Sequence, residues 1–175
     1  MSTERCSATR ASGNAPISLE IPSTPVYLCA VRSFVGEVCR RHGFSDMQAS
    51  QIVLGVDEAL ANVMRHGYEG RADGKIAVRI THVTDSAKGP GLEFVIDDWG
   101  RQVDVATIRS RDLRDVRPGG LGVHIIRQVM DVARYEAPAG QGMRLTLVKF
   151  VSSPPATGDG LDGGVDCCAC GGDHG

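Results

Sequence analysis

Residues 56–70 read VDEALANVMRHGYEG, and this stretch decides how the chain is expected to fold. Glu58 and Asn62 stand four residues apart, so on a helix they share one face. An apolar stripe at helical spacing runs partly to the side of that face, and its members are Ile52, Val56, Leu60 and Val63. The pattern predicts a helix that buries the stripe against a core and presents an acid–amide pair beside it.

The motifs that follow indicate what the acid–amide pair serves. Asp98 ends an apolar run, and Gly100 stands two residues later. An arginine-rich segment, residues 109–117, comes next, and a helical pattern begins directly after the cluster Gly119-Gly120-Leu121-Gly122. An acid–amide pair, a strand-ending aspartate and a glycine turn at a helix N-terminus can together build an ATP–magnesium site. The order and spacing carry this hypothesis, because each motif alone is common.

Bulk composition limits the function classes. The chain has 175 residues, of which 42% are hydrophobic and 23% charged, as expected for one globular domain. Its net charge of −2 argues against direct nucleic-acid binding, which normally needs a basic face. No apolar run approaches the roughly 20 residues that span a bilayer, and residues 1–15 lack an apolar signal core. We therefore expect a cytoplasmic protein with no membrane contact.

The composition divides the chain into three parts. Residues 1–15 are rich in Ser, Thr, Ala and Arg, and we expect a disordered leader. Residues 16–151 carry the periodic patterns and are the expected folded domain. Residues 152–175 are rich in Gly, Pro, Asp and Ser, which predicts a flexible tail.

The six cysteines are unevenly placed and do not suggest a disulfide framework. Cys29 and Cys39 fall in a helical pattern and are interpreted as small core residues. The tail gathers the soft ligands Cys167, Cys168, Cys170 and His174. Their spacing is too compressed for an ordinary zinc site, which favours an inert tail over a loose metal or redox role.

Local patterns predict the first half of the domain as a strand and two helices. Alternating apolar residues indicate a strand over 16–21. Thr24 and Pro25 resemble an N-cap with proline at the first helical position, and Gly43 ends that helix. Ser45 and Gln48 form a capping-box pattern at the start of the next helix, which we expect to run to about residue 66 with Gly67 as its C-terminal stop.

The second half reads as two hairpins around a helix. Strands are predicted over 76–80 and 92–96, with a turn at 88–91. Residues 101–118 suggest a lid with a short helix at 105–108, and the final elements are expected at 123–130, 133–137 and 143–151. This order predicts the α+β class. We expect a two-layer α/β sandwich with helices on one face of a mixed, mostly antiparallel sheet.

The residue types of the two central motifs suit nucleotide chemistry. The amide oxygen of Asn62 is a hard, neutral ligand for magnesium, and the carboxylate of Glu58 can orient or deprotonate a hydroxyl. Asp98 can accept a hydrogen bond from an exocyclic amine such as that of adenine, and Gly100 lets a flat ring approach the backbone. An exposed polar patch and a strand-ending turn are the alternatives for these motifs.

The glycine cluster suits phosphates, because the free N–H groups and the dipole of a helix N-terminus favour anions. A hinge with a helix cap is the alternative. Of the upstream arginines 109, 111, 114 and 117, we predict that Arg117 reaches the γ-phosphate as the lid closes, because it lies nearest the glycines. His66 has two interpretations: contact with phosphate or nucleophile, or a helix C-terminal residue favoured by the dipole.

Together these motifs resemble the N, G1 and G2 boxes of the Bergerat-fold (GHKL) ATPases, with Glu58-x-x-x-Asn62, Asp98-x-Gly100 and Gly120-x-Gly122 in the three places. The text of residues 56–70, and GGLGVHIIRQVMDVARYE at 119–136, is similar to the bacterial anti-sigma-factor serine kinases of the partner-switching type. The resemblance covers about residues 16–151.

The resemblance implies a Bergerat ATP-binding fold, with ATP and Mg²⁺ as cofactors. Glu58 would act as base on a serine hydroxyl, and Asn62 would hold the magnesium ion. Asp98 would select adenine above a floor at Gly100. Gly120 and Gly122 would support the phosphates. We expect the nucleotide site also to include His66, Gly119 and Leu121.

It also implies partners. The target serine would belong to an anti-sigma-factor antagonist, which would compete with a sigma factor for the kinase, and the kinase would be a homodimer.

One position departs from the family pattern. The second box usually continues D-x-G-x-G, and Gln102 stands where its last glycine would be. This keeps an alternative open, in which the fold is a non-catalytic regulatory module that binds nucleotide or only a partner.

Overall fold

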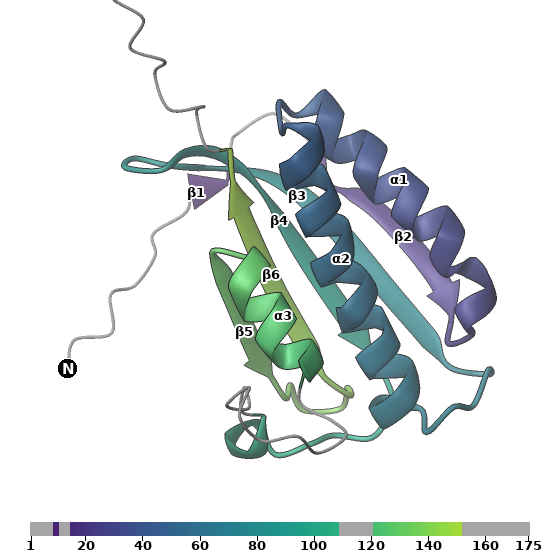
Figure 1. Cartoon of the computed structure of the whole chain (residues 1–175). Helices are drawn as coiled ribbons and strands as arrows, with labels where there is room; N and C mark the ends of the chain where they lie inside the picture. Colours follow the sequence, from purple (N-terminus) through teal and green to yellow (C-terminus); the bar gives the residue numbers. More distant parts are fainter. Residues whose placement is uncertain (1–8, 11–14, 109–120, 152–175) are drawn as a thin grey trace, which may run out of the picture.

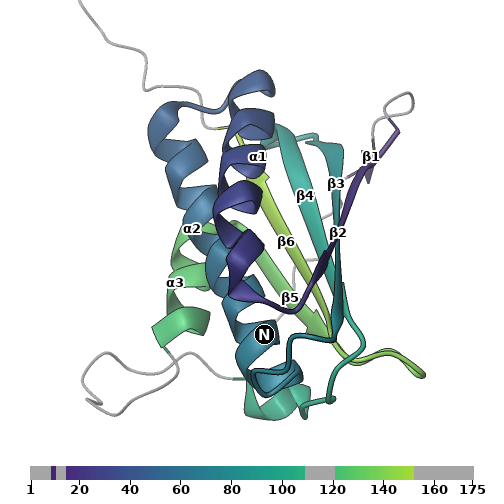
Figure 2. The same ribbon diagram turned by 90° about the vertical axis from the view of Figure 1, so that its right-hand side faces the viewer.

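The computed structural model describes residues 9–10, 15–108 and 121–151. Within them, three α-helices lie on one face of a sheet, α1 (Leu28–Arg41), α2 (Asp46–Asn62) and α3 (Leu121–Val129). Figure 1 shows the helices in front of the strands, and the side view in Figure 2 separates the two layers. The predicted α+β two-layer class is confirmed.

The described strands form one sheet in the order β1-β3-β4-β6-β5, and β2 pairs with the same strand as β1, namely β3. Their bounds are β1 Thr9–Arg10, β2 Ile17–Pro22, β3 Lys75–Asp85, β4 Gly89–Asp98, β5 Val132–Glu136 and β6 Arg144–Phe150. The strands predicted from alternation and both predicted hairpins are therefore confirmed. The first turn, however, lies at 86–88 instead of the predicted 88–91, because β4 begins at Gly89. The two-residue β1 lies in the segment that composition marks as a leader.

Every described strand pair is antiparallel, so the parallel component of the predicted mixed sheet is not found among the described residues. Two helices separate β2 from β3, which returns the chain to the sheet in the opposite direction. One helix, α3, separates β4 from β5, and these two strands run the same way. They are not neighbours, because β6 lies between them and pairs with both.

The core lies between the helices and the covered face of the sheet. The predicted stripe of α2 is buried except for Val63, which is partly exposed. The inward positions of the two central strands are also buried, and they are Ile76, Val78, Ile80, Leu92, Phe94 and Ile96. Gly55 lets α3 lie close to α2, because a Cβ there would stand 2.9 Å from both Val129 and Met130.

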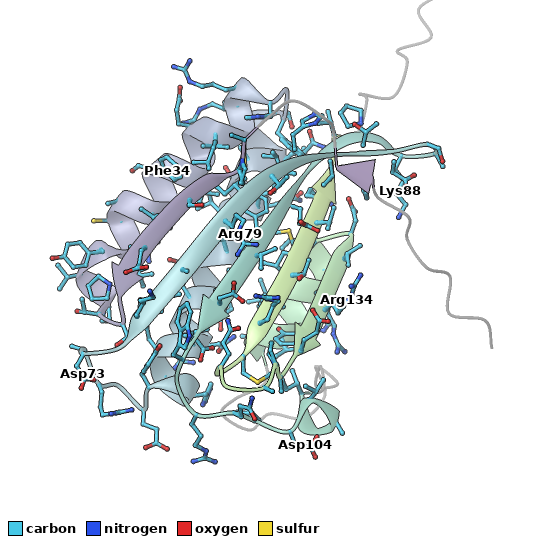
Figure 3. The ribbon with its side chains drawn as sticks, turned by 180° about the vertical axis from the view of Figure 1, so that it is seen from behind. Phe34, Asp73, Arg79, Lys88, Asp104 and Arg134 are labelled. Atoms are coloured by element: carbon cyan, nitrogen blue, oxygen red, sulfur yellow. The ribbon has the colours of Figure 1, made fainter. Side chains whose placement is uncertain are left out.

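The opposite face of the sheet is left without helices among the described residues. Arg79 and Arg134 stand on it in Figure 3. Asp97 also faces this side, where it is nearly buried and accepts hydrogen bonds from Arg144 at 2.6 Å and from Arg79 at 3.4 Å. Asp98, one residue later, faces the helices instead, as strand alternation requires.

The element ends confirm some of the sequence signals. Ser45 and Gln48 form the predicted capping box, and Gly43 follows α1 with a φ of +85°. Thr24 is in the extended N-cap conformation, but its side chain makes no capping bond. The proline after it begins a 3₁₀ turn, Pro25–Tyr27, rather than α1 itself. The predicted short helix near 105–108 is a 3₁₀ turn, Val105–Thr107.

The helical run ends at Gly67, close to the predicted residue 66, but Gly67 is not a left-handed helix cap. The helix continues into a wide turn of π type, Val63–Gly67, in which Tyr68 N–H donates to Val63 O at 3.1 Å. The left-handed residues come later, with φ values of 53° at Glu69 and 80° at Gly70. Gly67 is required for close packing instead.

Of the two cysteines predicted to lie in the core, one does and one does not. Cys39 is fully buried, whereas Cys29 is exposed on α1, so its assignment to the core is wrong. Cys167, Cys168 and Cys170 lie outside the described residues. Among the helices of the described residues, none has the length and apolar content needed to cross a membrane.

The buried hydroxyl of Tyr68 ties the end of α2 to two strands. It donates to Lys75 O and accepts hydrogen bonds from Lys75 N–H at 3.2 Å and from Trp99 N–H at 2.9 Å. Gly74 makes room for the ring, because a Cβ there would overlap the ring atoms of Tyr68. The start of β3 and the end of β4 are thereby held together where the chain leaves α2.

We predict that Tyr68→Phe lowers the free energy of unfolding by about 1–3 kcal/mol, because the Trp99 and Lys75 amides lose their partner. Urea unfolding measures this. Tyr27→Phe is the matched control, since Tyr27 is exposed and makes no described hydroxyl bond. Equal stability of the two variants would contradict the assigned role of the Tyr68 hydroxyl.

Candidate nucleotide site

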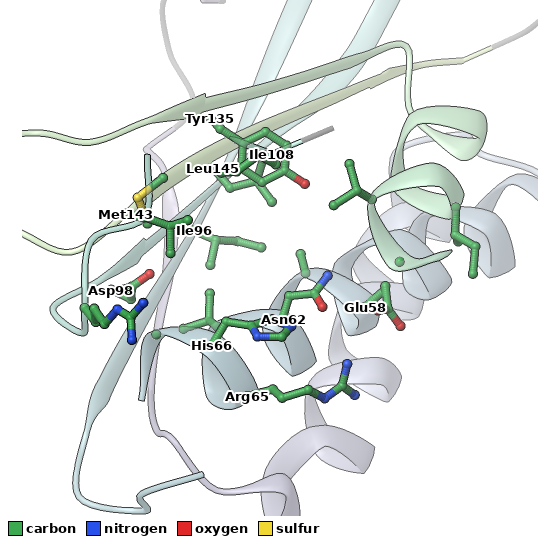
Figure 4. Close-up of a pocket in the computed structure, with 18 of the residues that line it drawn as sticks. Glu58, Asn62, Arg65, His66, Ile96, Asp98, Ile108, Tyr135, Met143 and Leu145 are labelled. Atoms are coloured by element: carbon green, nitrogen blue, oxygen red, sulfur yellow. The ribbon is translucent and has the colours of Figure 1, made fainter. Parts of the chain in front are cut away.

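One cavity of about 800 Å³ opens between α2, the start of α3 and the ends of β4, β5 and β6. This volume lies in the usual range for small-molecule sites. Its polar lining is Glu58, Asn62, Arg65, His66, Asp98, Arg101 and Tyr135. Its apolar lining includes Ile96, Val103, Ile108, Met143 and Leu145. In Figure 4, Asp98 stands at one side of the cavity and Glu58 at the other, with Asn62 between them.

The α2 wall contributes the acid–amide pair. Glu58 and Asn62 both line the cavity, and both are half-buried. Among the described residues, no donor reaches the carboxylate of Glu58 and no partner engages the amide of Asn62. His66 lies one further turn along the same wall and is exposed. The spacing predicts that Glu58 and Asn62 share one helical face, and the structure brings both of them, together with His66, to one cavity.

Glu58 lies against the first turn of α3. A Cβ at residue 122 would overlap the carboxylate of Glu58 in its present position, so the two residues lie in direct contact. Leu121, the first residue of α3, also lines the cavity and is exposed. The acid of the first motif and the glycine of the third are therefore neighbours, although 64 positions separate them in the sequence.

Asp98 lines the cavity from the end of β4 and is almost fully buried. The N–H of Gly100 donates to Oδ1 of this carboxylate at 2.8 Å. Burial raises the pKa of this carboxyl above its ordinary value, against the lowering effect of the Gly100 and Met143 backbone. A raised pKa means that the ionised group costs stability, and the cost grows as pH rises through that pKa.

Gly100 stands behind the cavity wall rather than on its surface. A Cβ there would overlap the carbonyl of Gly67, which itself lines the cavity. The next residue, Arg101, donates its N–H to the same carbonyl at 2.8 Å. The two glycines thus allow direct backbone contact between the end of α2 and the segment after β4.

Sequence reasoning missed the β5–β6 loop. Asp98 N–H donates to Met143 O at 3.0 Å, and Gly142 N–H donates to Asp98 O at 2.9 Å. A Cβ on Gly142 would overlap Oδ1 of Asp98. The glycine at 142, in a pattern of glycines at 140 and 142, was the available signal, and it was interpreted only as a turn.

Tyr135, on β5, was also missed. Its hydroxyl is buried and has no partner among the described residues. Burial raises the pKa of Tyr135, Arg127 lowers it and Glu58 raises it, so the net direction is upward. The phenol is therefore neutral at pH 7 and keeps its proton as a donor.

Arg117, the arginine predicted to reach the γ-phosphate, lies outside the described residues, and so do Gly119 and Gly120. The described cavity instead contains two arginines that the sequence reasoning did not select. Arg65 lies on α2's wall, and Arg101 forms an ion pair with Glu69 at 3.0 Å. Arg65 could have been found from its helical position three residues after Asn62.

The donor set fits a nucleotide better than a metal alone. The described residues contain no group of three or more His, Cys, Asp or Glu side chains that could hold a metal ion. One amide and one carboxylate suit magnesium only when substrate phosphates complete its oxygen shell. The apolar lining and the carboxylate of Asp98, which lines the cavity as an acceptor, fit a flat base that carries an amino group.

Comparison with known families agrees with this geometry. The family described as "Histidine kinase-like ATPase domain" matches residues 21–149. A relative called "Serine-protein kinase RsbW" from Bacillus pumilus is 27% identical over 146 residues, which is 78% of this chain and 86% of the relative. The protein of the same name from Listeria monocytogenes serovar 1/2a is 26% identical over 144 residues, covering 78% and 87%.

A solved structure supports the fold. The crystal structure of the RsbU and RsbW domains of Rv1364c from Mycobacterium tuberculosis superposes with a TM-score of 0.54 at 18% identity. The match covers 81% of this chain and 34% of that longer chain. The resemblance to Bergerat-fold ATPases, and within them to anti-sigma-factor serine kinases, is confirmed. The chain therefore belongs to the histidine kinase-like ATPase family.

Proposed function

We propose that this chain is an ATP-dependent protein serine kinase that acts as an anti-sigma factor. It transfers the γ-phosphoryl group of ATP to a serine of an anti-sigma-factor antagonist, and it sequesters a sigma factor that the unphosphorylated antagonist displaces. The proposal takes its substrate class from the relatives, which are called serine-protein kinases. It takes its chemistry from the cavity.

The observation that carries the proposal is the meeting of three motifs in one cavity. Asp98 offers an acceptor at one side, and Glu58 lies against Gly122 at the N-terminus of α3 at the other. An adenine at Asp98 would direct its phosphates towards α3, whose N-terminus favours anions. The phosphoryl group to be transferred would then lie beside the carboxylate of Glu58.

The transfer needs positioning and one proton acceptor. The serine oxygen forms a bond to the γ-phosphorus while the bond from that phosphorus to the β,γ-bridging oxygen breaks. ADP leaves with the electron pair. Glu58 orients the serine hydroxyl and takes its proton. Its carboxylate suits this role, because no cation among the described residues occupies it.

Asn62 and the phosphates would hold a magnesium ion, which supplies charge neutralisation on the phosphate oxygens. The amide oxygen of Asn62 adds no charge to this site. His66, one turn further along the same wall of the cavity, would also contact the phosphates. Arg117 and the glycines 119 and 120 complete the proposed phosphate contacts.

The remaining parts of the proposal concern the whole chain. The kinase domain spans residues 16–151, preceded by a leader and followed by an inert tail. The protein is a cytoplasmic homodimer that needs neither nucleic acid nor a membrane for its activity. Family resemblance supports the partners and the dimer, and the match of residues 21–149 lies inside the proposed domain.

We predict that Glu58→Gln lowers the rate of serine phosphorylation about 10²–10⁴-fold, because the amide cannot accept the proton. ATP affinity does not fall, because the adenine binds at the Asp98 end of the cavity and the substitution removes a negative charge beside the phosphates. The measurement is phosphate transfer to purified candidate antagonists, with calorimetry for ATP and magnesium.

Asp57→Asn is the control for Glu58→Gln. Asp57 is the preceding carboxylate of α2, and it pairs with Arg32 at 2.7 Å on the outer surface instead of lining the cavity. This control phosphorylates at the wild-type rate. A Glu58→Gln variant as active as wild type would remove Glu58 as base, and a wild type that binds no ATP would leave only the partner-docking alternative.

We further predict that Asp98→Asn weakens ATP binding by at least about tenfold, because a hydrogen bond to a charged acceptor is replaced by a weaker one. The variant is at least as stable as wild type at pH 7, since it removes a buried charge whose pKa is raised. Calorimetry and urea unfolding measure the two effects.

Asp97→Asn gives the opposite result. Its carboxylate faces the open side of the sheet and binds Arg144 and Arg79. The substitution lowers the free energy of unfolding by about 1–3 kcal/mol and leaves the Kd for ATP within about twofold. If both variants lost ATP affinity equally, Asp98 would not be the base-selecting group.

A further inference from the structure

The side-chain NH₂ group of Gln102 donates both of its protons to the β5–β6 loop, residues 137–143. Nε2 donates to Pro138 O and to Gln141 O, each at 2.8 Å. The two acceptors are carbonyls, so the NH₂ group and not the amide oxygen must face them. The side chain bridges segments that are 36 and 39 positions apart in the sequence. This is the residue that replaces the last glycine of the second family motif.

The bridged loop forms one wall of the base end of the cavity. Met143 lines the cavity, and its carbonyl accepts the N–H of Asp98. The N–H of Gly142 donates to the carbonyl of Asp98, and Gly142 also lies against the Asp98 carboxylate. The position of this loop therefore determines where the Asp98 carboxylate lies, and this carboxylate is the proposed hydrogen-bond acceptor for adenine.

Few other contacts hold the tip of the loop. Gln141 N–H reaches Pro138 O at a long 3.4 Å, and Gly140 has a φ of +74°. Four hydrogen bonds between described residues join the 98–102 segment to the 138–143 segment, and the Gln102 side chain makes two of them. A glycine at 102 would have no side chain with which to make either bond.

We propose that Gln102 is a positioning residue for the nucleobase: it clamps the β5–β6 loop against the segment after β4 and so fixes Asp98 and Met143 before adenine binds. This rests on the proposed nucleotide function. A glycine at residue 102 would leave the β5–β6 loop without this side-chain bridge. Because the bridge orders the loop before the nucleotide arrives, less conformational entropy is lost when adenine binds.

The sharpest variant is Gln102→Glu, because a carboxylate of the same shape has no proton to donate and faces two carbonyl oxygens. Ala139→Glu is the matched control, since it places the same charge on the same loop at an exposed position outside the clamp. Gln102→Ala removes the bridge without adding charge and serves if the glutamate variant does not fold.

The first measurement is amide hydrogen exchange without nucleotide, which tests the clamp independently of the proposed function. We expect exchange of the Gly142 and Asp98 amides, whose N–H groups join the loop to the end of β4, to be at least about tenfold faster in Gln102→Glu, while helix α2 is unchanged and Ala139→Glu resembles wild type. Unchanged exchange in the 138–143 loop would overturn the clamp.

The second measurement is calorimetric titration with adenosine and with ATP–magnesium. We expect Gln102→Glu to bind both ligands roughly tenfold more weakly, because both carry the adenine that contacts the positioned loop. The KM for ATP rises, whereas kcat stays within about twofold of wild type. A purely structural role would lower thermal stability without this equal loss.

Adenosine affinity equal to wild type, with faster exchange, would overturn the positioning role. If wild type binds neither ligand, the nucleotide function fails, and the base-positioning role fails with it. In that case the exchange result still decides whether the clamp exists.

Discussion

The site depends on one backbone contact, between Gly67 at the end of the π turn that follows α2 and Gly100 just after β4. A Cβ at residue 100 would overlap the carbonyl of Gly67, and that carbonyl accepts the N–H of Arg101 at 2.8 Å. Because the contact admits no side chain, the backbone after α2 lies directly against the backbone after β4. This packing places Asn62, the last residue of α2, in the same cavity as Asp98, the last residue of β4.

Most of the fold was predictable because its signals are local. Apolar alternation gave the strands, and the Ser45–Gln48 capping box gave the start of α2. The end of α2 was not predictable in the same way. Gly67 looks like a helix stop in sequence, but its lack of a side chain serves contact with Gly100, which is 33 positions away. The prediction for Cys29 was wrong because one position along a helix turns a side chain by about 100°, and only its neighbour Leu28 faces the core.

The candidate site was predictable as far as its groups occur in recognisable spacings. Glu58, Asn62 and Asp98 stand in such spacings, and all three line the cavity. The β5–β6 loop was not predictable, because Gly142 and Met143 reach Asp98 through the pairing of β4 with β6. Tyr135 was missed for the same reason. Its position depends on β5 joining the sheet at the far side of β6, which no local pattern states.

The contact of Glu58 with α3 constrains the charge of the site. A carboxylate at a helix N-terminus gains about 0.3–1 kcal/mol from the dipole, and the proposed triphosphate would draw on the same dipole. Two anions about 4 Å apart repel by about 1 kcal/mol in water and by about 4 kcal/mol near a protein surface. Glu58 and the phosphates therefore cannot share this terminus without a compensating cation. The neutral ligand Asn62, next to the acid on the same helical face, leaves the full charge of such a cation available for that compensation.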